Sequence, residues 1–233
     1  MERPSSSKAR AVPPPSGGGG GGGGVGGRRQ LSSIFALLTA LLAATIWLVD
    51  KNLSSFYVFD LDTLRHVAAS GVATRGNDSR AVVAAVVAEL AERYPAHVTR
   101  KEEWVFNNAG GAMGALTVLH ASTAVGTEGH TGRHTADDYF HILTGTQLAY
   151  VPGEFAPEVY PPGSVHHLRR GTVKQYKMAD ACFALEYARG WIPPMLFFGF
   201  ADGFSSTLDF PTLWATTRIT AREMLSNLLK GKI

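Results

Sequence analysis

The sequence predicts a mainly β domain with flanking helices, carried on one N-terminal membrane helix. Three observations lead to this fold class. Between residues 102 and 190, short apolar runs are broken by Gly and Pro, a pattern typical of small barrels and sandwiches. Residues 31–49 contain no charged side chain. Residues 51–100 and 191–233 show the wider apolar spacing of helices.

The composition indicates one domain with an appendage. The chain has 233 residues, with 26 Gly, 12 Pro and one Cys, which excludes a disulfide scaffold and a Cys-based zinc cluster. The net charge of +3 comes from residues 1–30, which hold five basic side chains and one acidic one, whereas the remainder is nearly neutral. A nucleic-acid-binding protein would carry its basic patch on the folded part, so no nucleic-acid partner is expected.

Residues 1–30 are predicted to be a disordered cytosolic tail and residues 31–50 a transmembrane anchor. The tail is rich in Pro, Ser and Gly and cannot bury enough apolar surface to offset its ordering entropy. The uncharged run would extend about 28 Å as a helix, enough to span a bilayer core. A buried core helix and a cleaved signal peptide are the alternatives, although the apolar region of a signal peptide is usually shorter.

The charges beside the anchor predict its orientation. Five Lys or Arg side chains precede the anchor and only Lys51 follows it closely, so the positive-inside rule places the tail in the cytosol and residues 51–233 in the lumen. A glycosylation sequon at Asn77 would report this orientation if it is modified.

Within the predicted lumenal domain, residues 51–100 should be helical, 101–190 should form the barrel and 191–233 should form membrane-surface helices. The apolar side chains of the helix near residue 82 recur on one face, with Asp78 or Ser79 as N-cap and Pro95 at the end. Strands are predicted at residues 103–107, 114–120, 139–143, 147–151, 158–162, 173–178 and 182–188. The last segment is basic and amphipathic, which favours a membrane surface; an ordinary helix packed on the barrel is the alternative.

One group of polar residues combines His134, Asp138 and His166. Their spacing relative to nearby Gly and Pro resembles the two sequence motifs of cupin barrels, which favours a small cupin-like β-barrel. The three side chains could form a facial metal-ligand set. However, Gly132 occupies the first His position of the metal-binding motif, and we expect no metal. Structural histidines inside or beside the barrel are the alternative.

A second candidate is Glu186, which shares a strand face with Ala184 and Ala188. Two small neighbours would leave room for a ligand beside the carboxyl group. If Glu186 is buried, desolvation would raise its pKa and keep it protonated, as a general acid requires. An exposed carboxylate paired with Arg189 is the alternative. Nucleophilic catalysis is not expected, because the chain has no Gly-x-Ser-x-Gly motif and Cys182 has no activating neighbour in sequence.

Five long blocks of the chain resemble the fungal sterol C-8 isomerases, whose animal relative is the sigma-1 receptor. The resemblance covers about residues 50–230, through the blocks 107–122, 126–145, 160–171, 183–193 and 206–224. It implies a trimeric endoplasmic reticulum membrane protein that takes its sterol from the bilayer and needs no cofactor. The implied reaction moves the sterol double bond from C8 to C7 by protonation and deprotonation through a carbocation. A non-catalytic, sigma-1-receptor-like ligand-binding protein is the alternative.

The resemblance also assigns roles to individual residues. Glu186 matches the essential glutamate of the family, and either Asp138 or Asp137 matches the second carboxylate. Asp138 has the spacing of a cupin ligand and is expected to point inward; by strand alternation Asp137 would then face out, unless a bulge intervenes. The expected substrate contacts are Trp104, Phe106, His134, Tyr139, Phe140 and Tyr187.

The chain departs from the family pattern after Ser122. Relatives carry about nine more residues here, forming an apolar strand that helps to line the pocket. Our hypothesis is an omission in the gene model or during splicing, and an inactive isoform is the alternative.

Overall fold

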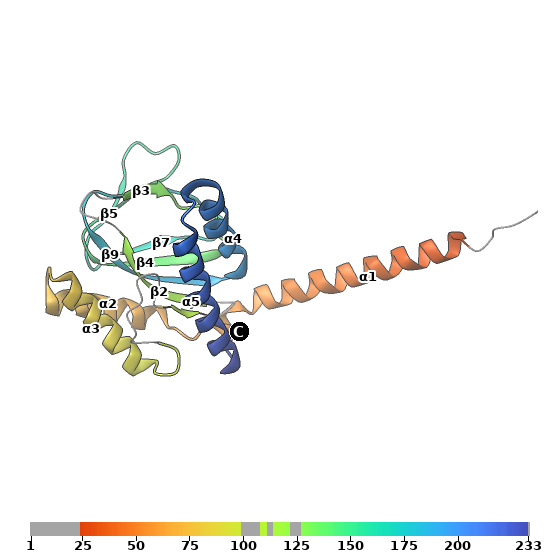
Figure 1. The fold of residues 1–233 in the computed structure, drawn as a ribbon, viewed down its shortest axis with the longest axis horizontal. Helices are drawn as coiled ribbons and strands as arrows, with labels where there is room; N and C mark the ends of the chain where they lie inside the picture. Colours follow the sequence, from red (N-terminus) through yellow and green to blue (C-terminus); the bar gives the residue numbers. More distant parts are fainter. Residues whose placement is uncertain (1–23, 99–107, 111–113, 122–126, 233) are drawn as a thin grey trace, which may run out of the picture. The chain divides into compact units, whose positions relative to one another are not determined.

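The computed structural model describes residues 24–98, 108–110, 114–121 and 127–232 (Figure 1). Two compact units divide the chain, residues 1–49 and residues 50–233. The first unit holds most of helix α1 (Gly24–Lys51). Its segment Gln30–Lys51 is long and apolar enough to cross a membrane, and none of this apolar stretch is buried.

Helix α1 begins at Gly24, inside the segment that the sequence predicts as tail. The helix therefore extends N-terminally beyond the predicted anchor at residues 31–50. Arg28, Arg29 and Gln30 are good helix formers, whereas the glycines of the first turn are poor ones. The rest of the predicted tail lies outside the described residues.

The second unit opens with helices. A short 3-10 helix, η1 (Leu53–Phe56), is followed by α2 (Leu61–Arg75) and α3 (Ser79–Arg93). The Asp60 carboxylate accepts a hydrogen bond from the Thr63 amide at 2.8 Å, and Asp78 caps α3 in the same way. The sequence correctly predicts helices in this region, the Asp78 cap and a helix end before Pro95.

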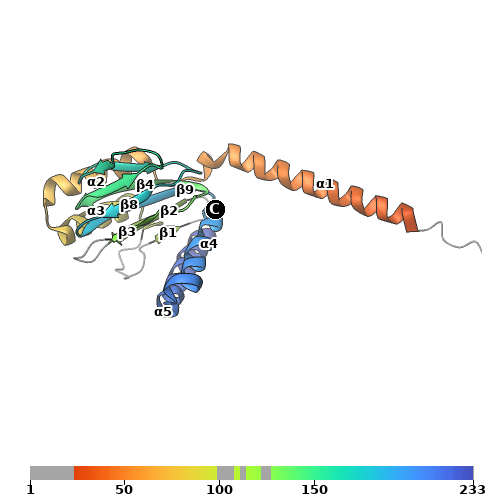
Figure 2. The same ribbon diagram turned by 90° about the horizontal axis from the view of Figure 1, so that it is seen from above.

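Two antiparallel sheets follow (Figure 2). The larger sheet has the order β1-β2-β9-β4-β7 and the smaller one the order β3-β8-β5-β6. The larger sheet consists of β1 (Asn108–Gly110), β2 (Gly114–Ala121), β4 (Ala136–Thr144), β7 (Val165–Leu168) and β9 (Cys182–Gly190). The smaller sheet consists of β3 (Thr127–His130), β5 (Gln147–Tyr150), β6 (Glu158–Tyr160) and β8 (Gln175–Met178).

Most predicted strands correspond to observed ones. The run at residues 103–107 lies outside the described residues. Three observed strands, β1, β3 and β7, were not predicted. The sequence of β7, Val-His-His-Leu, lacks the apolar alternation of a half-buried strand. Pairing with β4 nevertheless holds it in the sheet.

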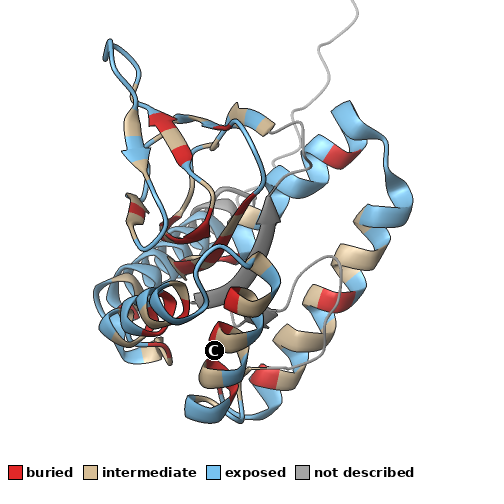
Figure 3. Ribbon diagram, turned by 90° about the vertical axis from the view of Figure 1, so that its left-hand side faces the viewer, coloured by how far each residue is buried: buried red, intermediate tan, exposed pale blue. Residues whose placement is uncertain are grey.

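The main hydrophobic core lies between the larger sheet and helices α2 and α3. Leu143, Leu185 and Tyr187 of β4 and β9 are fully buried in this core. They pack with a group of buried helical side chains: Leu64, Val67, Val82, Val86 and Leu90. Figure 3 shows buried positions on both strands and helices. Because strand side chains alternate, the intervening residues of β4 and β9 point to the opposite face of the sheet.

Helices complete the chain. Helix α4 (Pro193–Asp202), the π-helical turn η2 (Gly203–Thr207) and α5 (Phe210–Leu229) follow β9. Asp209 caps α5 by accepting from the Thr212 amide. This region is helical, as predicted. Large apolar side chains are exposed on it, namely Phe197, Phe198, Phe204, Phe210, Trp214, Leu225, Leu228 and Leu229.

Candidate active site

The register of β4 and β9 brings two carboxyl side chains to one face of the sheet. Asp138 is paired with Ala188, and Phe140 is paired with Glu186. Asp138 and Glu186 are therefore diagonal neighbours on adjacent strands, a separation that side chains can bridge. The neighbouring Ala188 side chain is small and leaves space above the backbone. This face is the one opposite the α2–α3 core.

Asp138 is completely buried, and neither of its carboxyl oxygens has a hydrogen-bond partner among the described residues. His134 Nδ1 lies 3.7 Å from Asp138 Oδ2, which is too far for a hydrogen bond. Burial raises the pKa of Asp138 well above its usual range, and the Glu186 carboxyl raises it further. Burial likewise raises the pKa of Glu186, while its interaction with Asp138 acts in the opposite direction.

These two carboxyl groups require a proton between them. Two carboxylates can only accept hydrogen bonds, so the doubly ionised pair would place two like charges in a buried space without a donor. Protonating one group gives an O–H donor for the other. The pair therefore titrates as a unit and holds one proton to higher pH than an isolated carboxyl group would.

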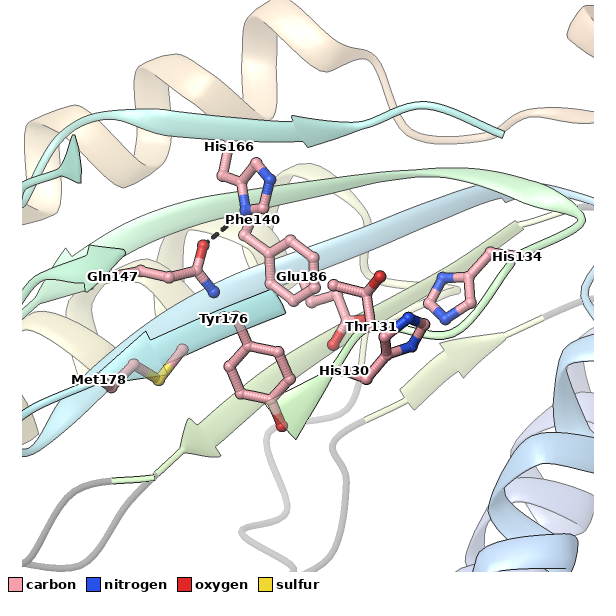
Figure 4. Close-up of a pocket in the computed structure, with 9 residues that line it drawn as sticks. All are labelled: His130, Thr131, His134, Phe140, Gln147, His166, Tyr176, Met178 and Glu186. Atoms are coloured by element: carbon pink, nitrogen blue, oxygen red, sulfur yellow. Dashed lines mark hydrogen bonds between the residues drawn. The ribbon is translucent and has the colours of Figure 1, made fainter. Parts of the chain in front are cut away.

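A cavity of about 220 Å³ lies beside Glu186. Its described lining comprises His130, Thr131, His134, Phe140, Gln147, His166, Tyr176, Met178 and Glu186 (Figure 4). Glu186 is half-buried and lines this space, whereas Asp138 is fully buried and is not among the described lining residues. The two carboxyl groups thus differ in their access to the cavity.

The structure gathers four of the predicted site residues, namely Glu186, Asp138, His134 and Phe140. The other described ones are turned away. Asp137 accepts hydrogen bonds from His167 Nε2 and from the Arg170 amide, both at about 3 Å, on the opposite face of the sheet. An inward role for Asp137 is therefore not supported by its position, because it alternates with Asp138 along β4.

Two tyrosines are displaced from their expected positions for the same reason. Tyr139 stacks on His167 with ring centroids 4.3 Å apart, and its hydroxyl accepts from Arg189. Tyr187 is fully buried in the α2–α3 core, where it contacts Phe59 edge-on. Neither lines the cavity. Trp104 and Phe106 lie outside the described residues.

No group of three or more His, Cys, Asp or Glu side chains within the described ranges is placed to hold a metal ion. His166 Nδ1 instead lies 2.7 Å from the amide oxygen of Gln147. His134, Asp138 and His166 therefore do not converge in the way that a facial ligand set requires.

The sequence analysis overlooked several lining residues. Tyr176 and Met178 lie one strand period apart on β8, so alternation within the predicted strand could have found them. No local pattern indicated Gln147. Its position beside His166 depends on the contact between β5 and β7, two strands of different sheets that are separated in the sequence.

Sequence comparison places this site in a family. Residues 36–232 match the family described as ERG2 and Sigma1 receptor like protein. The chain belongs to this family. A C-8 sterol isomerase of Gibberella zeae is 67% identical over 88% of this chain and 91% of the relative. A Neurospora crassa C-8 sterol isomerase is 64% identical over 85% of this chain and 82% of the relative.

More distant family members include a sigma non-opioid intracellular receptor 1 of Danio rerio, 36% identical over 77% of this chain and 82% of the receptor. Among solved structures, a double-stranded β-helix protein of Klebsiella pneumoniae is 16% identical, with a TM-score of 0.30 over 41% of this chain and 84% of that chain. A likeness of that extent does not by itself establish a common fold.

The alignment with the Gibberella zeae relative is longer than the part of this chain that it covers. It spans 213 positions, whereas 88% of this chain is about 205 residues. About eight positions of the relative therefore stand opposite gaps in this chain. The predicted deletion after Ser122 has this size, although residues 122–126 lie outside the described part.

Proposed function

We propose that the chain is a C-8 sterol isomerase that moves a ring double bond of a sterol from C8 to C7. The observation that carries this proposal is the buried pair of Asp138 and Glu186, which retains a proton beside a largely apolar cavity. Double-bond migration needs one group that protonates an alkene carbon and one that removes a proton from a neighbouring carbon. Relatives at 61–67% identity carry the name C-8 sterol isomerase.

In the proposed mechanism, the carboxylic acid of Glu186 gives its proton to C9 of the sterol. The electron pair of the double bond forms the new C9–H bond, and C8 becomes a tertiary cation. The carboxylate left behind, together with Asp138, stabilises this positive charge in a site that excludes water. A carboxylate then removes a proton from C7, and the C7–H electron pair forms the new double bond. One proton is gained and one lost, so the reaction is redox-neutral and consumes no cofactor.

The aromatic and apolar lining supports a sterol as the ligand. Phe140 lies directly across the strand pair from Glu186, and its ring face can stabilise a nearby cation. Ligand pockets usually have volumes of about 300–1,000 Å³. The described cavity of about 220 Å³ is smaller, so we propose that only part of the ring system enters it.

We also propose a cupin-like barrel formed by the two sheets, a lumenal domain at residues 51–233 and a cytosolic tail. The flanking charges support this orientation. The exposed apolar side chains of α4 and α5 support contact with the bilayer that supplies the sterol. Family resemblance is the basis for proposing a location in the endoplasmic reticulum and a homotrimer.

A ligand-binding receptor without catalysis is the second candidate. The receptor relatives are 35–36% identical to this chain, whereas the fungal isomerases named above exceed 60%. The difference favours the isomerase.

Complementation of a yeast strain lacking C-8 sterol isomerase tests the function. Growth and accumulation of the C7-unsaturated sterol are expected with the chain and are compared with the Gibberella zeae relative as positive control. If the relative rescues and a stably expressed chain does not, this form of the protein is not an active isomerase.

The proposed omission after Ser122 has its own test. Sequencing of the transcript across codons 119–128 should reveal about nine additional codons. An uninterrupted match to the present sequence would disprove the omission.

A further inference from the structure

His166 lies in the same row of the sheet as Glu186. Phe140 on β4 is paired with Glu186 of β9 on one side and with His166 of β7 on the other. Neighbouring strands are about 4.8 Å apart, so the backbones of Glu186 and His166 are separated by about 10 Å. Both side chains line the cavity, with the Phe140 ring between them (Figure 4).

The Gln147 amide, oriented with its oxygen towards His166, sets the tautomer of the ring. His166 Nδ1 lies 2.7 Å from Gln147 Oε1, and a carbonyl oxygen can only accept a hydrogen bond. Nδ1 therefore carries the proton, and Nε2 presents a lone pair. Burial lowers the pKa of His166 to about 4, so the ring is neutral at physiological pH.

The Nε2 lone pair has no partner. His166 is fully buried, and its Nε2 has no hydrogen-bond donor among the described residues. The nearest charged groups are occupied with one another, because Glu158 Oε2 accepts from both Lys174 Nζ at 2.5 Å and the Tyr160 hydroxyl at 2.7 Å. A buried acceptor without a donor is costly, so a ligand that supplies an O–H group is favoured at this position.

Stacking holds the ring in place. Tyr160 packs parallel to His166 with ring centroids 4.4 Å apart, and Phe140 stacks at 5.7 Å. Together with the hydrogen bond to Gln147, these contacts fix the orientation of the imidazole ring, and so the direction of the Nε2 lone pair. A preorganised acceptor of this kind loses little entropy when it binds a donor.

We propose that His166 Nε2 accepts a hydrogen bond from the hydroxyl group of the sterol and so orients the ring system with its double bond towards Glu186. This inference rests on the proposed isomerase function. A sterol offers one strong donor, its alcohol, on an otherwise apolar skeleton. The lining is mixed, and His134 Nδ1 is a second buried nitrogen without a hydrogen-bond partner among the described residues. The neutral acceptor His166 Nε2, beside Phe140, Tyr176 and Met178, matches the chemistry of the sterol. His166 is accordingly a binding residue that sets the position of the substrate, and not a catalytic one.

The test compares a C8-unsaturated sterol with its 3-deoxy analogue, which lacks the donor. Wild-type protein should prefer the alcohol by about tenfold or more in kcat/KM, because the analogue leaves a buried acceptor unpaired. The difference should lie mainly in KM, as expected for an interaction present before and during the reaction. His166→Phe keeps the aromatic stacking but removes the acceptor, and should bring the preference close to one.

His167→Phe is the matched control. His167 is the next residue on β7, but its ring stacks on Tyr139 and bonds to Asp137 on the opposite face. This variant should retain the wild-type preference for the alcohol. Binding of both ligands, measured by thermal shift, provides a readout that does not depend on turnover.

The outcomes separate the two proposals. Equal kcat/KM for alcohol and analogue in an active wild-type protein overturns the role of His166, as does an unchanged preference in folded His166→Phe. In that case, the buried Nε2 binds only water. Should His166→Phe fail to fold, the wild-type preference still decides. Selective binding of the alcohol without any turnover would support His166 and contradict the isomerase function instead.

Discussion

Asp138 and Glu186 are diagonal neighbours across the β4–β9 strand pair: Asp138 lies opposite Ala188, two places from Glu186, and Glu186 lies opposite Phe140, two places from Asp138. Because strand side chains alternate, the two carboxyl groups lie on the face of the sheet opposite the α2–α3 core. Asp138 lacks any hydrogen-bond donor among the described side chains. Two acceptors in this arrangement are stable together only when they share a proton. The sheet register thus leads the pair to hold one proton to higher pH than an isolated carboxyl group would.

Glu186→Gln should lower isomerase activity by about 10²- to 10⁴-fold, because the amide cannot deliver a proton. The sheet should remain intact, since the two side chains have nearly the same shape. Asp137→Asn is the control and should retain activity within severalfold. Sterol analysis of complemented yeast measures both. Rescue by Glu186→Gln at the wild-type level would refute the proposed acid.

Raising the pH should inactivate the protein. Burial raises the pKa of the pair in the fold, so the protonated acid persists to higher pH than in a free carboxyl group, and kcat/KM should fall as pH rises through the raised pKa. The stability that protonation of the pair confers is fully present below the ordinary carboxyl pKa and is lost as pH rises from there through the raised pKa, because the folded state releases its proton last. Unfolding curves at increasing pH should show a smaller loss for Asp138→Asn. Parallel curves for the two proteins would contradict the coupled pair.

Acid should destabilise the fold through His166. Its pKa is about 4 in the fold and 6.5 in the unfolded reference, so the unfolded chain binds the proton first as pH falls. Stability is fully present above pH 6.5 and declines towards pH 4, by up to about 3 kcal/mol for this shift. Lys174, Glu158 and His167 also act on this titration. Denaturant midpoints should fall less steeply for His166→Phe, and an equal slope would exclude His166 as the cause.

Gly145 should not tolerate a side chain. Its φ of +76° disfavours other residues, and an added Cβ would meet the Ala181 carbonyl oxygen and lie 2.8 Å from Cys182 Cα. Gly145→Ala should therefore destabilise the protein by several kcal/mol. Gly153 also has a positive φ, +95°, but nothing lies within 4 Å of its added Cβ, so Gly153→Ala should cost only about 1 kcal/mol. Melting temperatures of the two variants should differ clearly.

Asn77 tests the orientation of the membrane anchor. The residue is exposed in the turn before α3, so a lumenal domain would present the sequon to glycosylation. Expression in a eukaryotic host should give a glycan-dependent mobility shift that Asn77→Gln abolishes. Ser205→Ala is the control. Ser205 lies in an exposed turn outside any sequon, so this variant should leave the mobility shift unchanged. A glycan confirmed at an engineered N-terminal sequon would reverse the proposed orientation.

Local sequence patterns predicted the helical regions, a cap of α3 at Asp78 or Ser79 and most strands, because these depend on contacts between residues close in the chain. The cap, which the structure assigns to Asp78, and the alternation of Glu186 with Leu185 and Tyr187 are examples. The cupin-like spacing favoured Asp138 over Asp137 as the inward carboxyl, and the two side chains do lie on opposite faces.

Only the tertiary structure decided which of these side chains share a space. The sequence separates Asp138 from Glu186 by a long stretch, and nothing local indicates that β4 and β9 are neighbours in a register that aligns both with one cavity. The same holds for the bond between His166 and Gln147. Strand pairing is a long-range choice that depends on the packing of the whole domain. The sequence by itself therefore determined the chemistry available, and the sheet register determined where that chemistry meets.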